Sequence, residues 1–250
     1  MTIAQLPSAG RALVLQHHPD EHPGALGPML TAAGLTITTV ELDAGEPIPS
    51  LDEFDMLIAM GGPMDVWQEA EHPWLVTEKA AIRHWVTELD RPYLGVCLGH
   101  QLLADALGGT VGPMEEPEIG VAEISLTQKG LYDQVFGHLP EVVYGLQWHG
   151  AAVERPPVGA AVLAGNDHCA VQALRVGARA WGVQFHVEVE TSTIPKWAQV
   201  PEYEEALART GSSAASLELA VETHLELMAS AARTLFQGIV GSLVGLTVPR

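Results

Sequence analysis

Positively charged residues are scarce in this chain. Its 250 residues include 12 Lys and Arg against 31 Asp and Glu, so the formal net charge is -19 at pH 7. A protein that binds nucleic acid or an anionic membrane needs a basic surface to meet the phosphates. The composition therefore argues against both kinds of partner.

Cysteines and long apolar runs are also scarce. The two cysteines, Cys97 and Cys169, do not make a disulfide framework. No uninterrupted apolar stretch reaches the roughly 18 residues of a membrane-spanning helix. A signal peptide has a basic start followed by an apolar run, and this pattern is missing, so we expect neither feature. We expect a reduced, cytoplasmic compartment, in which a thiol nucleophile would survive.

Apolar residues, in contrast, make up 47% of the chain, which is enough for a well-buried core. Apolar or β-branched runs predict strands at residues 11–17, 36–42, 56–60 and 92–96. Helical patterns lie between and after them, at residues 26–33, 73–89 and 98–109. This alternation predicts an α/β fold with a mostly parallel sheet flanked by helices, whose ligands bind beyond the carboxyl ends of the strands.

The pattern changes after Gly109. Short strand-like segments separated by turn residues predict antiparallel strand additions and hairpins, at residues 121–126, 142–146, 161–163, 170–174 and 181–185. From Ser213 onward, apolar residues recur at helical spacing. We expect one domain over residues 1–250, with residues 191–250 as a helical C-terminal extension.

Residues 92–109 carry the first candidate for chemistry. Cys97 lies between Gly95 and Gly99, where an apolar strand turns sharply into a helix. This is the cysteine form of the glycine-flanked nucleophile elbow, in which the flanking glycines allow a strained backbone to lift the nucleophile above the sheet edge. A helix N-terminus favours thiolate over thiol, and its N–H groups point at developing negative charge.

A cysteine nucleophile needs a base and a group that orients the base. His186 ends an apolar strand and can reach the same sheet edge as Cys97. Glu188 follows two residues later, and residues two apart on an extended backbone point to the same side. The carboxylate of Glu188 can therefore orient the imidazole of His186.

Three sequence blocks make the chain similar to the class I, triad-type, glutamine amidotransferase domain family, which has a flavodoxin-like sheet. They are MGGPMDV at residues 60–66, GVCLGHQ at 95–101 and GVQFHVE at 182–188. The resemblance implies that Cys97 is the nucleophile, that His186 is the acid and base, and that Glu188 orients it. It further implies an oxyanion hole from the backbone N–H groups of Gly62 and Leu98.

The same resemblance suggests a substrate pocket. Gln101 would line it, and QWHG at residues 147–150 is similar to the family loop that covers the amino-acid end of the substrate, which makes His149 and Gly150 candidates. The next residue is commonly Asp in similar proteins but is Ala151 here, which removes a carboxylate and leaves the substrate open. The remaining histidines have no metal-ligand spacing, so we expect no metal and no cofactor.

Three functions fit these residues. The first is release of ammonia from glutamine through a Cys97 thioester, for a synthetase partner subunit. The second is a free-standing γ-glutamyl hydrolase or peptidase, which would act on another γ-glutamyl compound. The third is a binding module without catalysis.

Overall fold

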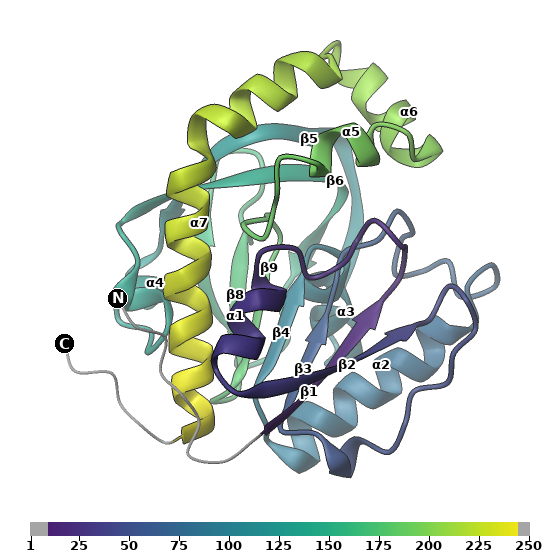
Figure 1. Cartoon of the computed structure of the whole chain (residues 1–250), viewed down its shortest axis with the longest axis vertical. Helices are drawn as coiled ribbons and strands as arrows, with labels where there is room; N and C mark the ends of the chain where they lie inside the picture. Colours follow the sequence, from purple (N-terminus) through teal and green to yellow (C-terminus); the bar gives the residue numbers. More distant parts are fainter. Residues whose placement is uncertain (1–9, 245–250) are drawn as a thin grey trace.

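The chain folds around a nine-stranded sheet with the strand order β2-β1-β3-β4-β9-β8-β7-β5-β6. A computed structural model describes residues 10–244 (Figure 1). The strands are β1 (Gly10–Gln16), β2 (Leu35–Glu41), β3 (Met56–Ala59), β4 (Tyr93–Val96), β5 (Thr110–Leu126), β6 (Val142–Arg155), β7 (Ala161–Gly165), β8 (Ala173–Val176) and β9 (Ala180–Val183).

The sheet has a parallel part and an antiparallel part. Strands β2, β1, β3, β4 and β9 pair in parallel. Strands β8, β7, β5 and β6 continue the sheet in antiparallel pairs. The predicted α/β fold with antiparallel additions is therefore confirmed.

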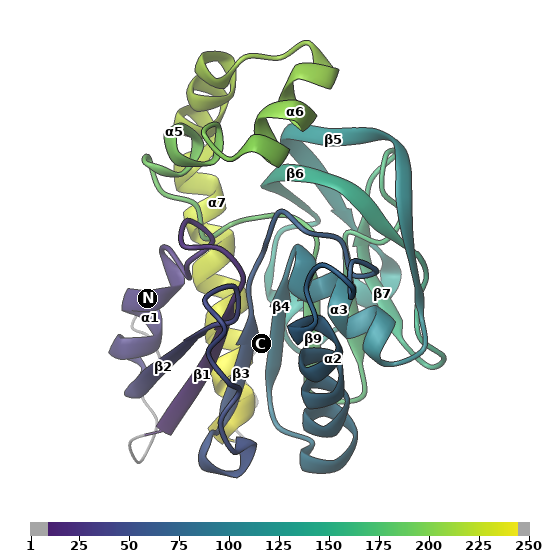
Figure 2. The same cartoon turned by 90° about the vertical axis from the view of Figure 1, so that its right-hand side faces the viewer.

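Helices cover both faces of the parallel part. The helices of the described residues are α1 (Leu26–Ala32), α2 (Trp74–His84), α3 (Leu98–Ala106), α4 (Gln128–Leu131), α5 (Thr193–Trp197), α6 (Pro201–Thr210) and α7 (Ala214–Val244), and shorter turns of helix are η1 (Leu51–Glu53), η2 (Trp85–Leu89) and η3 (Phe136–His138). Figure 2 shows α1 and α7 on one side of the strands and α2 and α3 on the other. Strands β3 and β4 are consequently buried along their whole length, as expected for parallel strands covered on both faces.

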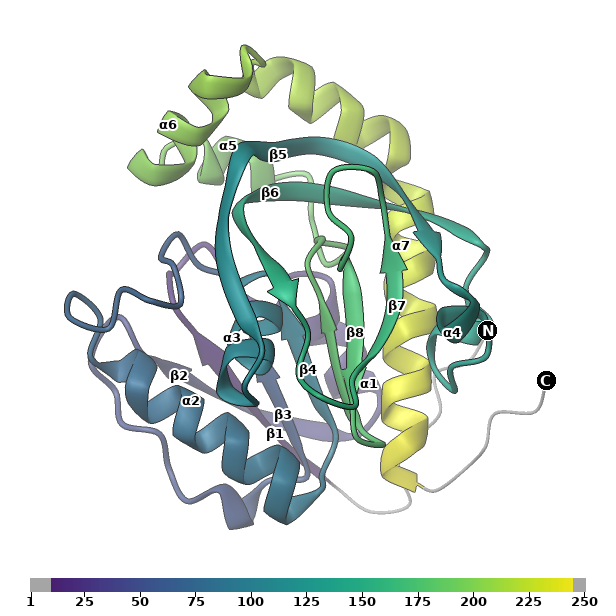
Figure 3. The same cartoon turned by 180° about the vertical axis from the view of Figure 1, so that it is seen from behind.

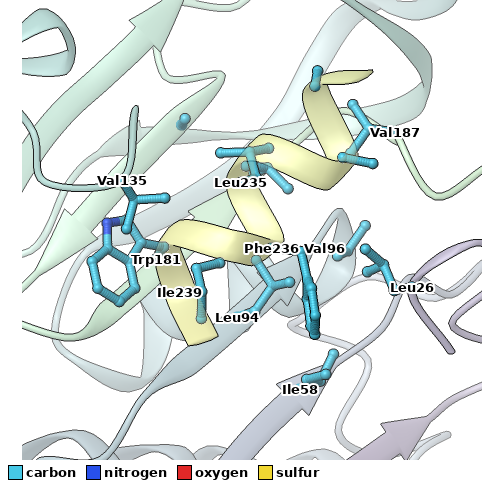
Figure 4. Close-up of a cluster of buried hydrophobic side chains, with 14 of the residues drawn as sticks. Leu26, Ile58, Leu94, Val96, Val135, Trp181, Val187, Leu235, Phe236 and Ile239 are labelled. Carbon is cyan, nitrogen blue, oxygen red and sulfur yellow. The ribbon is translucent and has the colours of Figure 1, made fainter. Parts of the chain in front are cut away.

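The long helix α7 completes the core on one face of the sheet. Its side chains Leu235, Phe236 and Ile239 pack in one cluster with Ile58 of β3 and Leu94 of β4 (Figure 4). The apolar stripe of α7 is buried only when the helix lies across the strands. This explains why α7 packs on β3 and β4, which lie much earlier in the sequence.

The structure differs from the sequence expectations in the second half of the chain. Strand β5 has 17 residues and β6 has 14, where only short strands were predicted. Pro113 and Pro117 have the appearance of turn residues, but they lie at an irregularity in the pairing of β5 with β6 and bend the strand without ending it.

Helices α5 and α6 lie within residues 191–250, which were expected to be helical, but the sequence did not indicate their separate bounds. They are short, and Pro195 and Pro201 resemble helix breakers in sequence, although Pro201 begins α6 at a position that tolerates proline. Figure 3 shows β5 and β6 arching side by side toward these helices and the start of α7. A separate apolar cluster that includes Leu146, Trp197 and Leu217 joins the arch to them.

Within residues 10–244, no helix is both long and apolar enough to cross a membrane. The expectation of one domain over residues 1–250 stays a prediction, and its two ends lie outside the described residues.

Candidate active site

Cys97 is held on a strained turn between β4 and α3. Its backbone has φ 50 and ψ -104, which is rare for a residue with a side chain. A Cβ placed on Gly95 would lie 2.3 Å from the carbonyl oxygen of Gly99, and one placed on Gly99 would lie 2.1 Å from that of Ala59. Both glycines are required because backbone passes against them where the strand turns into the helix.

His186 is fixed from two sides. Its backbone N–H donates to Leu146 O at 2.8 Å and its own carbonyl accepts from Leu146 N at 3.0 Å, so β6 holds it just beyond the end of β9. The ring Nδ1 donates to Glu188 Oε1 at 2.6 Å. The other carboxylate oxygen of Glu188 accepts from the backbone N–H of Val187 at 3.0 Å, which fixes the carboxylate itself.

The environment of His186 favours its charged form. Burial alone would lower its pKa, but the negative charges of Glu188 and Cys97 and hydrogen bonding raise the pKa well above the ordinary value. The structure thus brings Cys97, His186 and Glu188 together, as the sequence predicted for their positions.

Gln184 is a neighbour of Cys97 that sequence reasoning did not assign. Its side-chain Nε2 donates to Cys97 Sγ at 3.6 Å. The signal was present, because Gln184 lies two residues before His186, the same spacing that suggested Glu188 as its partner.

A cavity of about 150 Å³ opens beside Cys97. It is lined by Gly62–Asp65, Cys97, Leu98, Gln101, Trp148–Ala151, Glu202, Tyr203 and Ala206. The predicted pocket residues Gln101, His149 and Gly150 therefore lie around the same cavity as the cysteine. Its acidic side chains are Asp65 and Glu202, and no Lys or Arg of the described residues 10–244 lines it.

The pocket residues are held from behind by a buried polar layer. Gln101 Nε2 donates to Ala151 O at 3.0 Å, and His149 Nδ1 donates to the same oxygen at 3.0 Å. The other ring nitrogen of His149 lies 3.2 Å from Glu118 Oε2. Glu118 in turn accepts from Gln172 Nε2 at 2.9 Å, so its carboxylate is already hydrogen-bonded to protein side chains.

Two residues that line the cavity have a backbone N–H without a protein acceptor among the described residues. Within residues 10–244, the N–H groups of Gly62 and Leu98 donate to no backbone or side-chain oxygen. Leu98 is the first residue of α3, where helix geometry leaves the N–H free. These are the two groups that the sequence predicted as oxyanion donors.

Sequence reasoning also missed a buried carboxylate near His186. Glu21 is 1% exposed, and its Oε1 accepts a hydrogen bond from the Tyr203 hydroxyl of α6. Its other oxygen has no partner among the described residues. A Cβ placed on Gly61 would lie 2.4 Å from that oxygen and 3.1 Å from His186 Cε1. The carboxylate of Glu21 and the imidazole of His186 therefore both lie against Gly61.

The site thus has a cysteine on a strand-to-helix elbow, a buried histidine–glutamate pair and free backbone N–H groups at the carboxyl edge of a parallel sheet. These features define an α/β protein with a cysteine nucleophile elbow. Within this class, the chain belongs to the class I glutamine amidotransferase family, because the model of Glutamine amidotransferase class-I matches residues 28–197, more than half of the chain.

Individual relatives agree with this assignment. The chain is 32% identical to a glutamine-hydrolysing GMP synthase subunit of Sulfolobus acidocaldarius, over 62% of this chain and 79% of that protein. It is also 32% identical to the glutamine amidotransferase-like protein YfeJ of Salmonella typhimurium, over 71% of this chain and 75% of that protein.

A solved structure supports the fold. The crystal structure of a glutamine amidotransferase from Thermotoga maritima superposes with a TM-score of 0.83, over 93% of this chain and 98% of that chain. The two sequences are 24% identical, so this likeness bears on the fold alone.

Proposed function

We propose that this chain hydrolyses a γ-glutamyl amide, with glutamine as the first choice of substrate, through a thioester on Cys97. The supporting observation is that Cys97 borders one cavity together with Gly62 and Leu98, whose N–H groups have no acceptor among the described residues, while His186 interacts with Cys97 and is hydrogen-bonded to Glu188.

In the first half-reaction, the proton of the Cys97 thiol already lies on His186, whose raised pKa favours the imidazolium, and the thiolate sulfur attacks the γ-carbonyl carbon. The carbonyl oxygen becomes an oxyanion that accepts hydrogen bonds from the N–H groups of Gly62 and Leu98. His186 then gives its proton to the leaving nitrogen, the C–N bond breaks, and ammonia departs from a γ-glutamyl thioester.

In the second half-reaction, His186 takes a proton from water as the water oxygen attacks the thioester carbon. The same N–H groups stabilise the second oxyanion, and His186 returns its proton to the Cys97 sulfur as the C–S bond breaks, which releases glutamate and restores the thiol. Glu188 keeps the imidazole oriented and stabilises its charged form. Gln184, at 3.6 Å from the sulfur, is placed to stabilise the thiolate.

We propose a synthetase subunit as the acceptor of the ammonia, in a reducing cytoplasm that keeps Cys97 as a thiol. The relative from Sulfolobus acidocaldarius bears the name of a synthase subunit, which supports the two-chain arrangement. The competing function, a free-standing γ-glutamyl hydrolase, is favoured by Ala151 in the pocket lining, where a carboxylate common in similar proteins is missing.

A turnover screen of the isolated chain tests the proposal. Glutamine and several γ-glutamyl amides and peptides are compared by release of ammonia or glutamate, with Cys97→Ala and His186→Ala as inactive controls. Turnover of glutamine that both substitutions abolish supports the first choice. Rapid turnover of a γ-glutamyl conjugate with negligible glutaminase activity would favour the free-standing hydrolase, and equal rates in all three proteins would leave only a binding role.

A further inference from the structure

A second buried histidine–glutamate pair lies behind the glycine turn that borders the cavity. His17 follows β1 and Glu78 belongs to α2, and both side chains are fully buried. His17 Nε2 lies 2.9 Å from Glu78 Oε1 and 3.1 Å from Oε2. The ring stacks on Trp74, with 5.3 Å between ring centroids and an interplanar angle of 15°.

The other ring nitrogen of His17 is bound to the peptide between Gly61 and Gly62. Nδ1 lies 2.9 Å from the carbonyl oxygen of Gly61. A carbonyl oxygen can only accept, so Nδ1 carries a hydrogen and donates it. This holds whether the proton between Nε2 and Glu78 lies on the imidazole or on the carboxylate. Burial lowers the pKa of His17, but the charge and hydrogen bond of Glu78 more than offset this, so the pKa is raised.

The Gly61–Gly62 peptide has its orientation set by this contact. The described residues contain no cis peptide bond, so the carbonyl of Gly61 and the N–H of Gly62 point in opposite directions. The carbonyl points at His17, and the N–H therefore points away from it. Gly62 lines the cavity beside Cys97 and Leu98.

The peptide is also packed tightly against His17. A Cβ placed on Gly62 would lie 2.9 Å from His17 Cβ and 3.0 Å from Leu98 Cδ2. The backbone at Gly62 thus lies directly against the first carbon of the His17 side chain, with no room for a side chain of its own. A hydrogen bond to the carbonyl also polarises the peptide, which strengthens its N–H as a donor.

We propose that His17, held by Glu78, is a positioning residue that keeps the N–H of Gly62 directed at the oxyanion formed at Cys97. This inference rests on the proposed function, because it assigns a cause to one of its two oxyanion donors. His17 does not line the cavity and acts through the Gly61–Gly62 peptide alone.

Stability alone explains the pair poorly. Replacing a buried ion pair by apolar side chains of similar volume is often neutral or stabilising, so a buried pair is weak support for a structural role. The His17–Glu78 pair instead fixes the direction of the Gly61–Gly62 peptide through the hydrogen bond to the Gly61 carbonyl. An apolar side chain could not make that hydrogen bond.

Three substitutions test the inference. His17→Leu removes both ring nitrogens, His17→Asn keeps an N–H donor at about the position of Nδ1, and Glu78→Gln keeps a hydrogen-bonding partner for the ring without its charge. His84→Leu is the matched control, because His84 lies on α2, has 44% of its side chain exposed and faces Glu88 at 3.2 Å.

We expect His17→Leu to lower kcat on the preferred substrate by about 10- to 100-fold with KM close to the wild-type value, since loss of an oxyanion donor itself costs about 10²- to 10³-fold. His17→Asn and Glu78→Gln should retain more kcat than His17→Leu, and the control should match wild type. The rate of Cys97 alkylation by iodoacetamide should be unchanged in all of them, because this reaction forms no oxyanion.

Wild-type kcat in a folded His17→Leu protein would overturn the inference. A parallel loss of alkylation rate would also overturn it, because His17 would then act on the thiol. If His17→Leu does not fold, His17→Asn and Glu78→Gln decide through the same comparison of kcat with alkylation rate.

Crystal structures of wild type and the His17 variants separate this inference from the proposed function. They show the direction of the Gly61–Gly62 peptide whatever substrate is used. An unchanged peptide in His17→Leu overturns the inference even if the enzyme is a glutaminase. A turned peptide supports it even if the wild-type protein releases no ammonia, a result that would overturn only the proposed function.

Discussion

The hydroxyl of Tyr203 donates a hydrogen bond to the buried carboxylate of Glu21, across 182 positions of sequence. This contact joins α6 to the segment that follows β1, and Tyr203 also lines the cavity beside Cys97. The carboxylate of Glu21 and the imidazole of His186 both approach Gly61, so Glu21 lies next to the catalytic histidine of the proposed mechanism. Helix α6 is therefore part of the site.

Glu21 should make the protein less stable as pH rises. Burial raises its pKa from 4.5 to about 7, although His186 and Tyr203 oppose the rise. The stabilising contribution of the neutral carboxyl is complete below about pH 4.5, which is the unfolded value, and is lost as pH rises through about 7.

Glu21→Gln stays neutral at every pH and should gain stability relative to wild type as pH rises. Between pH 5 and pH 8 the difference in unfolding free energy should shift by about 2 to 3 kcal/mol in favour of the variant. Urea unfolding of both proteins at the two pH values measures it. A difference that does not vary with pH would show that Glu21 ionises normally in the fold.

The two cysteines should differ sharply in reactivity. Cys97 sits at the N-terminus of α3 beside His186, whereas burial raises the pKa of Cys169 to about 11. The thiolate is the reactive form, so brief alkylation at neutral pH should label Cys97 first. Peptide mass spectrometry identifies the labelled cysteine, with Cys97→Ala as the control. Preferential labelling of Cys169 would contradict the assignment of Cys97 as nucleophile.

Local patterns were sufficient to predict strands β1 to β4 of the parallel part and the meeting of Cys97 with His186. They did not predict the parallel pairing of β9 with β4, because residues 181–185 were expected to be an antiparallel addition. Apolar runs mark β1, β3 and β4 because these strands are buried on both faces, and a glycine-flanked cysteine after a strand has a specific backbone geometry. The period of two along an extended chain was enough to pair His186 with Glu188.

Residues supplied from distant elements could not be found in this way. Glu21, Glu78 and Tyr203 lie on separate segments, and each is a common residue type without a local pattern. His17 looked like an ordinary strand end, since its role depends on contacts with Gly61 and Glu78, which lie 44 and 61 positions away. Such contacts become visible only when the sheet order and helix positions are known.

Helix α7 should be essential to the fold. Phe236 is 1% exposed and packs against the sheet, whereas Leu219 on the same helix is 65% exposed. Phe236→Ala should destabilise the protein by about 3 to 5 kcal/mol because it opens a cavity, while Leu219→Ala should stay within about 0.5 kcal/mol of wild type. Denaturant unfolding measures both, and equal effects would mean that α7 is not packed as described.

Glu188 should act through the charge of His186 and not by transferring a proton. Glu188→Gln keeps an oxygen that can accept from Nδ1 but removes the negative charge that raises the pKa of His186. The pKa of His186 should fall, so the alkaline limb of kcat/KM, where the imidazolium loses its proton, should move to lower pH.

The same substitution should lower kcat by roughly 10- to 1000-fold, less than Cys97→Ala does, and leave the fold intact. A pH profile of kcat/KM for wild type and variant provides the measurement, with circular dichroism to verify folding. An unchanged profile would mean that another group orients the imidazole, and a loss as complete as that of Cys97→Ala would indicate a direct chemical role for the carboxylate.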